Sequence, residues 1–131
     1  MASDKLQVCV DFDGVVHAHR LPFVHPAEIP DVPVAGAFEA LTAYLDAGYA
    51  VAIFSCRNQH EGAPDAMRLW FAKHGFERAA ELTFPAIKPG AVLYIDDRAF
   101  CFQGEFPTVE AIGTFKTWHI VTGKQIGRAH V

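Results

Sequence analysis

The stretch VCVDFDGVVH, residues 8–17, decides the fold class of this chain. An apolar run ends there in two aspartates, Asp11 and Asp13, with one phenylalanine between them. Side chains two apart on an extended segment point to the same side, so these like charges repel unless a cation or a proton lies between them. The stretch therefore predicts a buried strand with a charged, cation-binding site at its carboxyl end.

Length and composition are those of an ordinary globular protein. The chain has 131 residues, 51% of them hydrophobic and 20% charged, with a formal net charge of −4. We expect a single domain over residues 1–131. The apolar runs are far shorter than the roughly 20 residues that span a bilayer, and the N-terminus has no apolar signal region. These features predict a cytoplasmic protein with no membrane partner, and the acidic balance gives no basic field to attract nucleic acid.

The cysteine content gives no sign of cross-linking. Cys9, Cys56 and Cys101 are an odd number without CxxC spacing, which disfavours a disulfide framework and a zinc site. We expect reduced thiols with structural roles.

Strand-like and helix-like segments alternate along the chain. Apolar runs typical of strands covered on both faces of a parallel sheet occupy residues 6–10, 50–54 and 91–95, with a further strand expected at 81–84. Apolar residues at helical spacing, each set closed by a glycine, predict helices within residues 34–48 and 64–75. This order predicts an α/β fold, a Rossmann-like parallel sheet with helices on both faces.

Polar side chains follow three of these strands, at the edge where open parallel sheets bind ligands. Four of them are carboxylates: Asp11, Asp13, Asp96 and Asp97. Carboxylate oxygens are ligands that Mg²⁺ prefers, so we expect these residues to bind Mg²⁺ as a cofactor. The cation would offset a repulsion of roughly 4 kcal/mol between carboxylates about 4 Å apart near a protein surface.

Three further residues at this edge suit phosphoryl transfer. Lys88 precedes the strand at 91–95 and can place a positive charge on a phosphate. Ser55, with Cys56 beside it, offers a hydroxyl and backbone N–H groups to phosphate oxygens. Asp11 is the expected nucleophile, which would form an aspartyl phosphate.

Four motifs resemble those of the haloacid dehalogenase superfamily and occur in the family's order. DFDGVV at residues 11–16 is similar to the first motif, DxDG followed by Thr or Val, and VAIFSC at 51–56 to the second, an apolar strand ending in Ser or Thr. Lys88 matches the third motif, and VLYIDD at 92–97 matches the acidic fourth. Together the motifs touch most of the chain from residue 6 to residue 98.

The resemblance implies a Mg²⁺-dependent phosphomonoester hydrolase that acts through an aspartyl phosphate. It implies Asp11 as nucleophile and metal ligand, and Asp13 as general acid and base, with its backbone carbonyl also on the metal. A carboxylic acid at Asp13 would protonate the leaving alcohol and then, as a carboxylate, activate water. Ser55 would bind the phosphoryl group, and Lys88 would stabilise charge. Of the acidic pair, Asp97 would be the direct metal ligand, with Asp96 beside it or acting through water.

Family members often carry a cap domain after the first motif or between the second and third. Here neither the interval from Asp13 to the first expected helix nor that from Ser55 to Lys88 has room for one. The resemblance then implies a capless, open site for a bulky or macromolecular phosphate ester, or an oligomer whose neighbouring subunit covers the site. The expected partners are a phosphorylated substrate, with nucleic acid only as substrate, and a second copy of the chain.

The segments after the first two motifs are rich in groups that could contact the substrate. The candidate substrate contacts are His17, His19, Arg20, Arg57 and Asn58. The alternative is that each is a solvated loop residue without a special role.

Two other functional classes stay open at this point. A catalytically weak relative of the same family would act as a binding or interaction module. A signalling receiver domain also uses Asp, Ser or Thr, Lys and Mg²⁺ on a parallel sheet. Receivers, however, close their first strand with an acidic pair, whereas here DxDG comes first and the acidic pair last.

Overall fold

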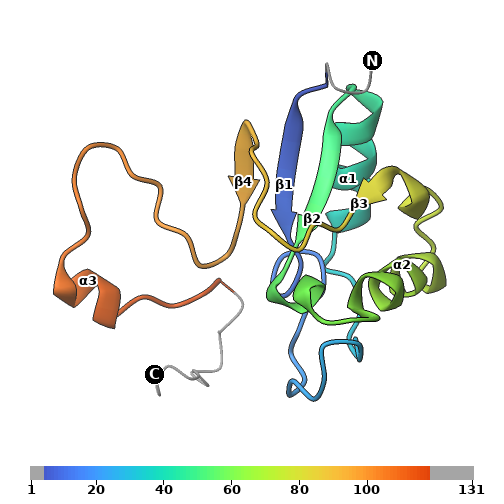
Figure 1. The fold of residues 1–131 in the computed structure, drawn as a ribbon. Coiled ribbons are helices and arrows are strands. Elements are labelled where there is room, and N and C mark those ends of the chain that lie inside the picture. The colour runs from blue at the N-terminus through green and yellow to red at the C-terminus, as the bar shows by residue number, and fades with distance from the viewer. Residues whose placement is uncertain (1–4, 119–131) are drawn as a thin grey trace. The chain divides into compact units, whose positions relative to one another are not determined.

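The computed structural model describes residues 5–118 (Figure 1). The chain divides into two compact units, one that ends at Asp96 and one that begins at Asp97. The organisation of the chain as a single domain stays a prediction.

The first unit is built on a four-stranded parallel sheet in the order β3-β2-β1-β4 (Figure 1). The strands are β1 (Gln7–Asp11), β2 (Ala50–Phe54), β3 (Leu82–Thr83) and β4 (Leu93–Ile95). The three middle residues of β1 and of β2 are buried, as expected for strands covered on both faces. The predicted α/β class and parallel sheet are confirmed.

Helices form where apolar residues recur at helical spacing. They are α1 (Ala37–Asp46) and α2 (Ala63–Lys73), with 3-10 turns η2 (Cys56–Gln59) and η3 (Ala79–Glu81). Pro64 lies in the first turn of α2, where its missing N–H costs nothing. Gly48 and Gly75 follow the two helices with φ of 95°, a left-handed conformation that side chains disfavour, so each glycine ends its helix.

The main core lies between the sheet and these two helices. Val8 and Val10 of β1 alternate into a cluster that also contains Leu41 of α1 and Phe71 of α2. The rings of Phe38 and Phe71 lie 5.6 Å apart between centroids, so α1 and α2 touch on the same face of the sheet. A helical layer on the opposite face stays a prediction, since the remaining helix, α3 (Val109–Gly113), belongs to the second unit.

The second unit, as far as residue 118, contains α3 and extended or turn segments. Thr108 caps α3, because its Oγ1 accepts a hydrogen bond from the Ala111 N–H at 3.0 Å. Large apolar side chains here are exposed, namely Phe100, Phe102, Phe106, Val109, Ile112 and Phe115.

Among residues 5–118, no helix combines the length and apolar character that crossing a membrane requires.

We expect Phe71→Ala to lower the free energy of unfolding by about 3–5 kcal/mol, because the ring is fully buried and its loss leaves a cavity. Leu69→Ala is the matched control on the same helix, since Leu69 is 71% exposed and its loss should cost less than about 0.5 kcal/mol. Urea unfolding of both variants measures the difference. Equal losses would contradict the placement of the core.

Candidate active site at the carboxyl edge of the sheet

A tight turn follows β1 and separates the two aspartates of the first motif. The Phe12 carbonyl accepts hydrogen bonds from the N–H groups of Val16 and His17, both at 2.9 Å, and Gly14 has a φ of 88°. The chain therefore leaves the extended conformation directly after Asp11, and the same-side rule for strands no longer applies to Asp13. The two carboxylates belong to different clusters of side chains.

The Asp13 carboxylate is paired with a guanidinium. Arg57 donates from Nε to Oδ2 at 2.8 Å and from its second terminal nitrogen to Oδ1 at 3.1 Å, a bidentate ion pair. His17 Nδ1 lies 2.9 Å from Oδ1. Burial alone would raise the pKa of Asp13, but the hydrogen bonds from His17 and Arg57 outweigh it and lower the pKa to about 2. Asp13 is thus held as a carboxylate at neutral pH, and its positive neighbour is Arg57.

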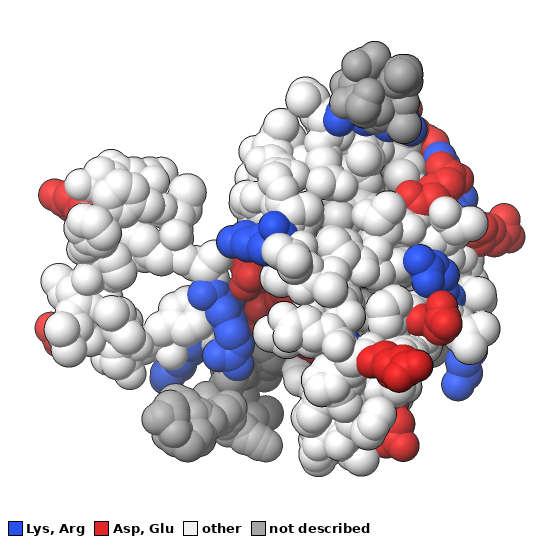
Figure 2. All heavy atoms as spheres, viewed as in Figure 1, with Lys and Arg blue, Asp and Glu red and all other residues white. Residues whose placement is uncertain are grey.

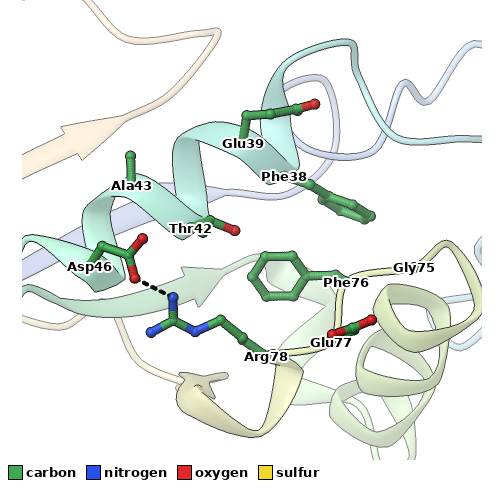
Figure 3. Close-up of a pocket in the computed structure, with 9 residues that line it drawn as sticks. All are labelled: Phe38, Glu39, Thr42, Ala43, Asp46, Gly75, Phe76, Glu77 and Arg78. Carbon is green, nitrogen blue, oxygen red and sulfur yellow. Dashed lines mark hydrogen bonds and ion pairs between the residues drawn. The ribbon is translucent and has the colours of Figure 1, made fainter.

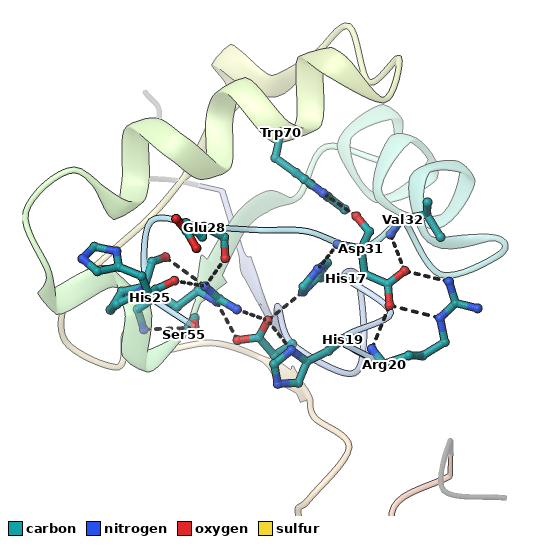
Figure 4. Close-up of polar contacts among 12 residues, drawn as sticks. His17, His19, Arg20, His25, Glu28, Asp31, Val32, Ser55 and Trp70 are labelled. Atoms are coloured by element: carbon teal, nitrogen blue, oxygen red, sulfur yellow. Dashed lines mark hydrogen bonds and ion pairs between the residues drawn. The ribbon is translucent and has the colours of Figure 1, made fainter. Parts of the chain in front are cut away.

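Arg57 also anchors the loop that precedes α1, in which Figure 4 labels His25 and Glu28. Its other terminal nitrogen, Nη1, donates to the backbone carbonyls of His25, Pro26 and Glu28, at 3.3, 2.9 and 3.1 Å. The side chain is 3% exposed. A buried charge needs a full set of partners, and here Asp13 and the loop provide them. The Arg57 side chain, which follows β2, therefore binds both Asp13 and residues 25–28.

Ser55 lies between β2 and η2. Its Oγ accepts a hydrogen bond from the Arg57 N–H at 3.1 Å, so the hydroxyl caps the 3-10 turn and the residue is buried. The neighbouring Cys56 is an exposed free thiol. The phosphate-binding role of both residues stays a prediction.

The first metal-binding expectation concerns Asp11, which ends β1, and Asp96, which follows the adjacent strand β4. Ligand oxygens of the two carboxylates lie within 4.8 Å of each other. Such a set of hard oxygen donors fits Mg²⁺. Asp97 begins the second unit, so its place in this set stays a prediction.

Lys88 lies beside the same strands. Its Nζ is 4.4 Å from the centroid of the Tyr94 ring on β4. Burial raises the pKa of the Cys9 thiol, and the charge of Lys88 acts against this rise, while Asp11 adds to it. The ammonium group of Lys88 thus packs on an aromatic ring, and its role towards phosphate stays a prediction.

A second cluster of ligand atoms contains Asp13, His17 and His19, within 4.8 Å of one another. The donor set does not suit a cation, because the Arg57 guanidinium already occupies the Asp13 carboxylate. We interpret this group as a hydrogen-bonded cluster.

The candidate substrate contacts fall into two groups. His17, Arg57 and Asn58 are buried and bonded within the chain, which does not suit direct contact with a substrate. His19 is partly exposed, and Arg20 is 66% exposed while pairing with Asp31. Substrate contact stays a prediction for His19 and Arg20.

Asp31 holds the other end of the loop and was not singled out from the sequence. Its carboxylate accepts hydrogen bonds from Arg20 Nε at 3.0 Å and from the Val32 N–H at 2.8 Å. Hydrogen bonds from the Arg20 side chain hold the pKa of Asp31 well below its usual range, against the opposing effect of burial. The Asp31 carbonyl accepts from Trp70 Nε1 at 2.9 Å. The sequence signal was weak, because an aspartate in a loop is common.

An open groove of about 660 Å³ lies elsewhere, between α1 and the segment after α2 (Figure 3). Its lining includes the acidic side chains Glu39, Asp46 and Glu77, and Arg78 pairs with Asp46 across it. Acidic walls disfavour a phosphate, and none of the predicted site residues lines the groove. On the face shown in Figure 2, acidic and basic side chains of the described residues are interspersed.

Comparison of the chain with protein-family models, with curated proteins and with solved structures gives no match.

We expect stability to fall in acid because Asp13 and Asp31 have lower pKa values folded than unfolded. The unfolded chain then binds more protons, so their contribution is present above about pH 4 and is lost as the pH falls towards 2. For Asp13, a pKa change from 3.8 to about 2 corresponds to roughly 2 kcal/mol. Urea midpoints measured between pH 5 and pH 3 test this.

The variant Asp31→Asn should show a shallower decline over that range, because one of the two carboxyl groups no longer titrates. Asp65→Asn removes an exposed carboxylate and should keep the wild-type slope. Equal slopes in the wild type and in Asp31→Asn would contradict the assignment.

Proposed function

We propose that this chain is a Mg²⁺-dependent phosphomonoester hydrolase with a haloacid dehalogenase-like core, acting through an aspartyl phosphate on Asp11. One observation carries the proposal: carboxylates that end or follow the adjacent strands β1 and β4, those of Asp11 and Asp96, lie within 4.8 Å at the carboxyl edge of a parallel sheet. The order of the four motifs along the sequence supports it.

Asp11 and Asp96 would hold Mg²⁺, with Asp97 and the Asp13 carbonyl as further ligands implied by the family resemblance. The bound cation would supply positive charge that lets a phosphate dianion approach a carboxylate. Lys88 would add a second positive charge, since its ammonium group lies over the ring of Tyr94 on β4, the strand that Asp96 follows.

In the first half-reaction, an Asp11 oxygen would form a bond to phosphorus as the bond to the leaving alcohol oxygen breaks. The leaving alkoxide takes up one proton from solvent. In the second half-reaction, the Asp13 carboxylate takes a proton from water, the water oxygen bonds to phosphorus, and the bond to Asp11 breaks. Phosphate leaves, Asp11 is restored, and the proton on Asp13 returns to solvent.

The ion pair with Arg57 favours one of the two roles proposed for Asp13. A carboxyl group with a pKa of about 2 is ionised at neutral pH, as the general base of the second half-reaction must be, but it is a weak base. Acting as an acid in the first half-reaction would require Asp13 to leave Arg57. Esters of acidic alcohols such as phenols need less protonation of the leaving group, so they should react faster than alkyl esters.

The intervals between β1 and α1 and between β2 and β3 are too short to hold a cap domain. They support a capless site open to solvent. An open site favours a bulky phosphate ester over a small metabolite that must be enclosed.

A second candidate function is a binding or interaction module of the same fold with little activity. The observation that favours it is the occupation of the Asp13 carboxylate by Arg57 and His17, which leaves this group poorly placed for proton transfer. The two candidates differ in turnover and agree in cation binding.

We expect phosphate release from aryl, alkyl, nucleotide and oligonucleotide phosphate esters to require Mg²⁺ and Asp11, with aryl esters fastest. Asp11→Asn should lower kcat at least about a thousandfold, because the amide is a poor nucleophile. Asp65→Asn, on an exposed face of α2, is the matched control and should keep the wild-type rate. Released phosphate, assayed with and without a chelator, is the measurement.

Turnover that survives in Asp11→Asn would reject the proposed nucleophile. A folded wild-type protein that binds Mg²⁺ but releases no phosphate would favour the binding module.

A further inference from the structure

The His17 ring is buried and packs against two aromatic side chains. It is 0% exposed, it stacks on Phe12 at 5.3 Å between centroids with planes 14° apart, and it meets Trp70 edge-on at 5.5 Å. A fully buried imidazole needs a partner for each ring nitrogen.

The hydrogen bonds of the two nitrogens assign the position of the ring proton. The Asp31 backbone N–H donates to Nε2 at 3.0 Å, so Nε2 carries no proton. The proton is therefore on Nδ1, which donates to Asp13 Oδ1 at 2.9 Å. The His17 ring therefore accepts a hydrogen bond from the Asp31 backbone and donates one to the Asp13 carboxylate. Figure 4 shows His17 between these groups.

The backbone beside His17 closes the base of the same loop. The Ala18 N–H donates to the Val32 carbonyl at 2.9 Å, and the Val34 N–H donates to the Val16 carbonyl at 2.8 Å. Asp31, next to this pairing, is fixed by Arg20 and by the Trp70 indole. The acceptor nitrogen of His17 thus faces a rigid donor.

We propose that His17 is a positioning residue that orients the Asp13 carboxylate through Nδ1–H and fixes residues 18–33 through Nε2. The reaction it serves is the proposed phosphoester hydrolysis, so the catalytic part of this inference rests on the proposed function. His17 acts through Asp13, and the substrate does not touch it.

Two substitutions of His17 separate the functions of its two ring nitrogens. In His17→Asn the amide nitrogen lies near the position of Nδ1, so a donor to Asp13 remains and the acceptor for Asp31 is lost. In His17→Gln an amide oxygen reaches the position of Nε2, so the acceptor remains and the donor to Asp13 is lost. His74→Gln is the control, because His74 packs on the same indole, at 5.0 Å between centroids, outside the Asp13 cluster.

We expect His17→Gln to lower kcat about tenfold or more with KM changed less than about twofold, because Asp13 loses one of its orienting donors. His17→Asn should keep kcat within about threefold of the wild type, because the donor remains. Its loop should instead open, which limited trypsin digestion measures as faster cleavage after Arg20, an exposed residue within the loop. His74→Gln should match the wild type in both assays.

The tautomer is measured independently of activity. In protein labelled with ¹⁵N-histidine, long-range proton–nitrogen correlation should show a protonated Nδ1 and an unprotonated Nε2 for the ring that disappears in His17→Gln. A proton on Nε2, or equal kcat in the Gln and Asn variants with unchanged loop cleavage, would overturn the proposal. If the wild type releases no phosphate, the proposed function fails, and the tautomer and the cleavage rates still decide whether His17 fixes the loop.

Discussion

The ion pair between Asp13 and Arg57 is the interaction on which the carboxyl edge depends. The two residues follow neighbouring parallel strands, and their side chains meet in a nearly buried bidentate contact. Removing one partner of such a pair leaves a buried charge without compensation, at a cost of about 3–5 kcal/mol. Since Arg57 also binds three carbonyls of the loop before α1, this pair joins β1, β2 and the loop into one unit. The site geometry follows from that connection.

Much of the fold could be predicted from hydrophobic spacing and glycine positions. The strand at residues 50–54 agrees with β2, and the predicted helical range 34–48 contains α1. The predicted range 64–75 begins one residue after α2 begins and ends two residues after α2 ends. Burial explains this success, because a segment covered by the core must carry an apolar pattern of matching period. The strand expected at 91–95 is shorter in the structure, where β4 begins at Leu93 after Pro89 and Gly90. Proline and glycine both disfavour strand pairing.

The polar cluster could be predicted only in part. The sequence indicated that a cation must lie near Asp13, but the expected cation was Mg²⁺, and the structure provides the Arg57 guanidinium. In the parallel register of β1 and β2, Asp11 lies opposite Phe54, so the residues just past the two strands lie side by side. Asp13 and Arg57 are such residues, and this placement could have predicted their contact. Burial of His17 and the anchoring of Asp31 depend on how the loop folds back, which no local pattern encodes. The side chains of His17 and Arg57 are neither solvated nor well placed for a substrate.

The phosphorylation of Asp11 can be tested on the intact chain. The protein is incubated with Mg²⁺ and acetyl phosphate, treated with borohydride, which reduces an aspartyl phosphate to homoserine, and digested with trypsin. Cleavage after Lys5 and Arg20 releases residues 6–20, which contain both Asp11 and Asp13. Homoserine at position 11, dependent on Mg²⁺, is the expected result. Homoserine at another aspartate, or none in a folded protein that binds Mg²⁺, would contradict Asp11 as the nucleophile.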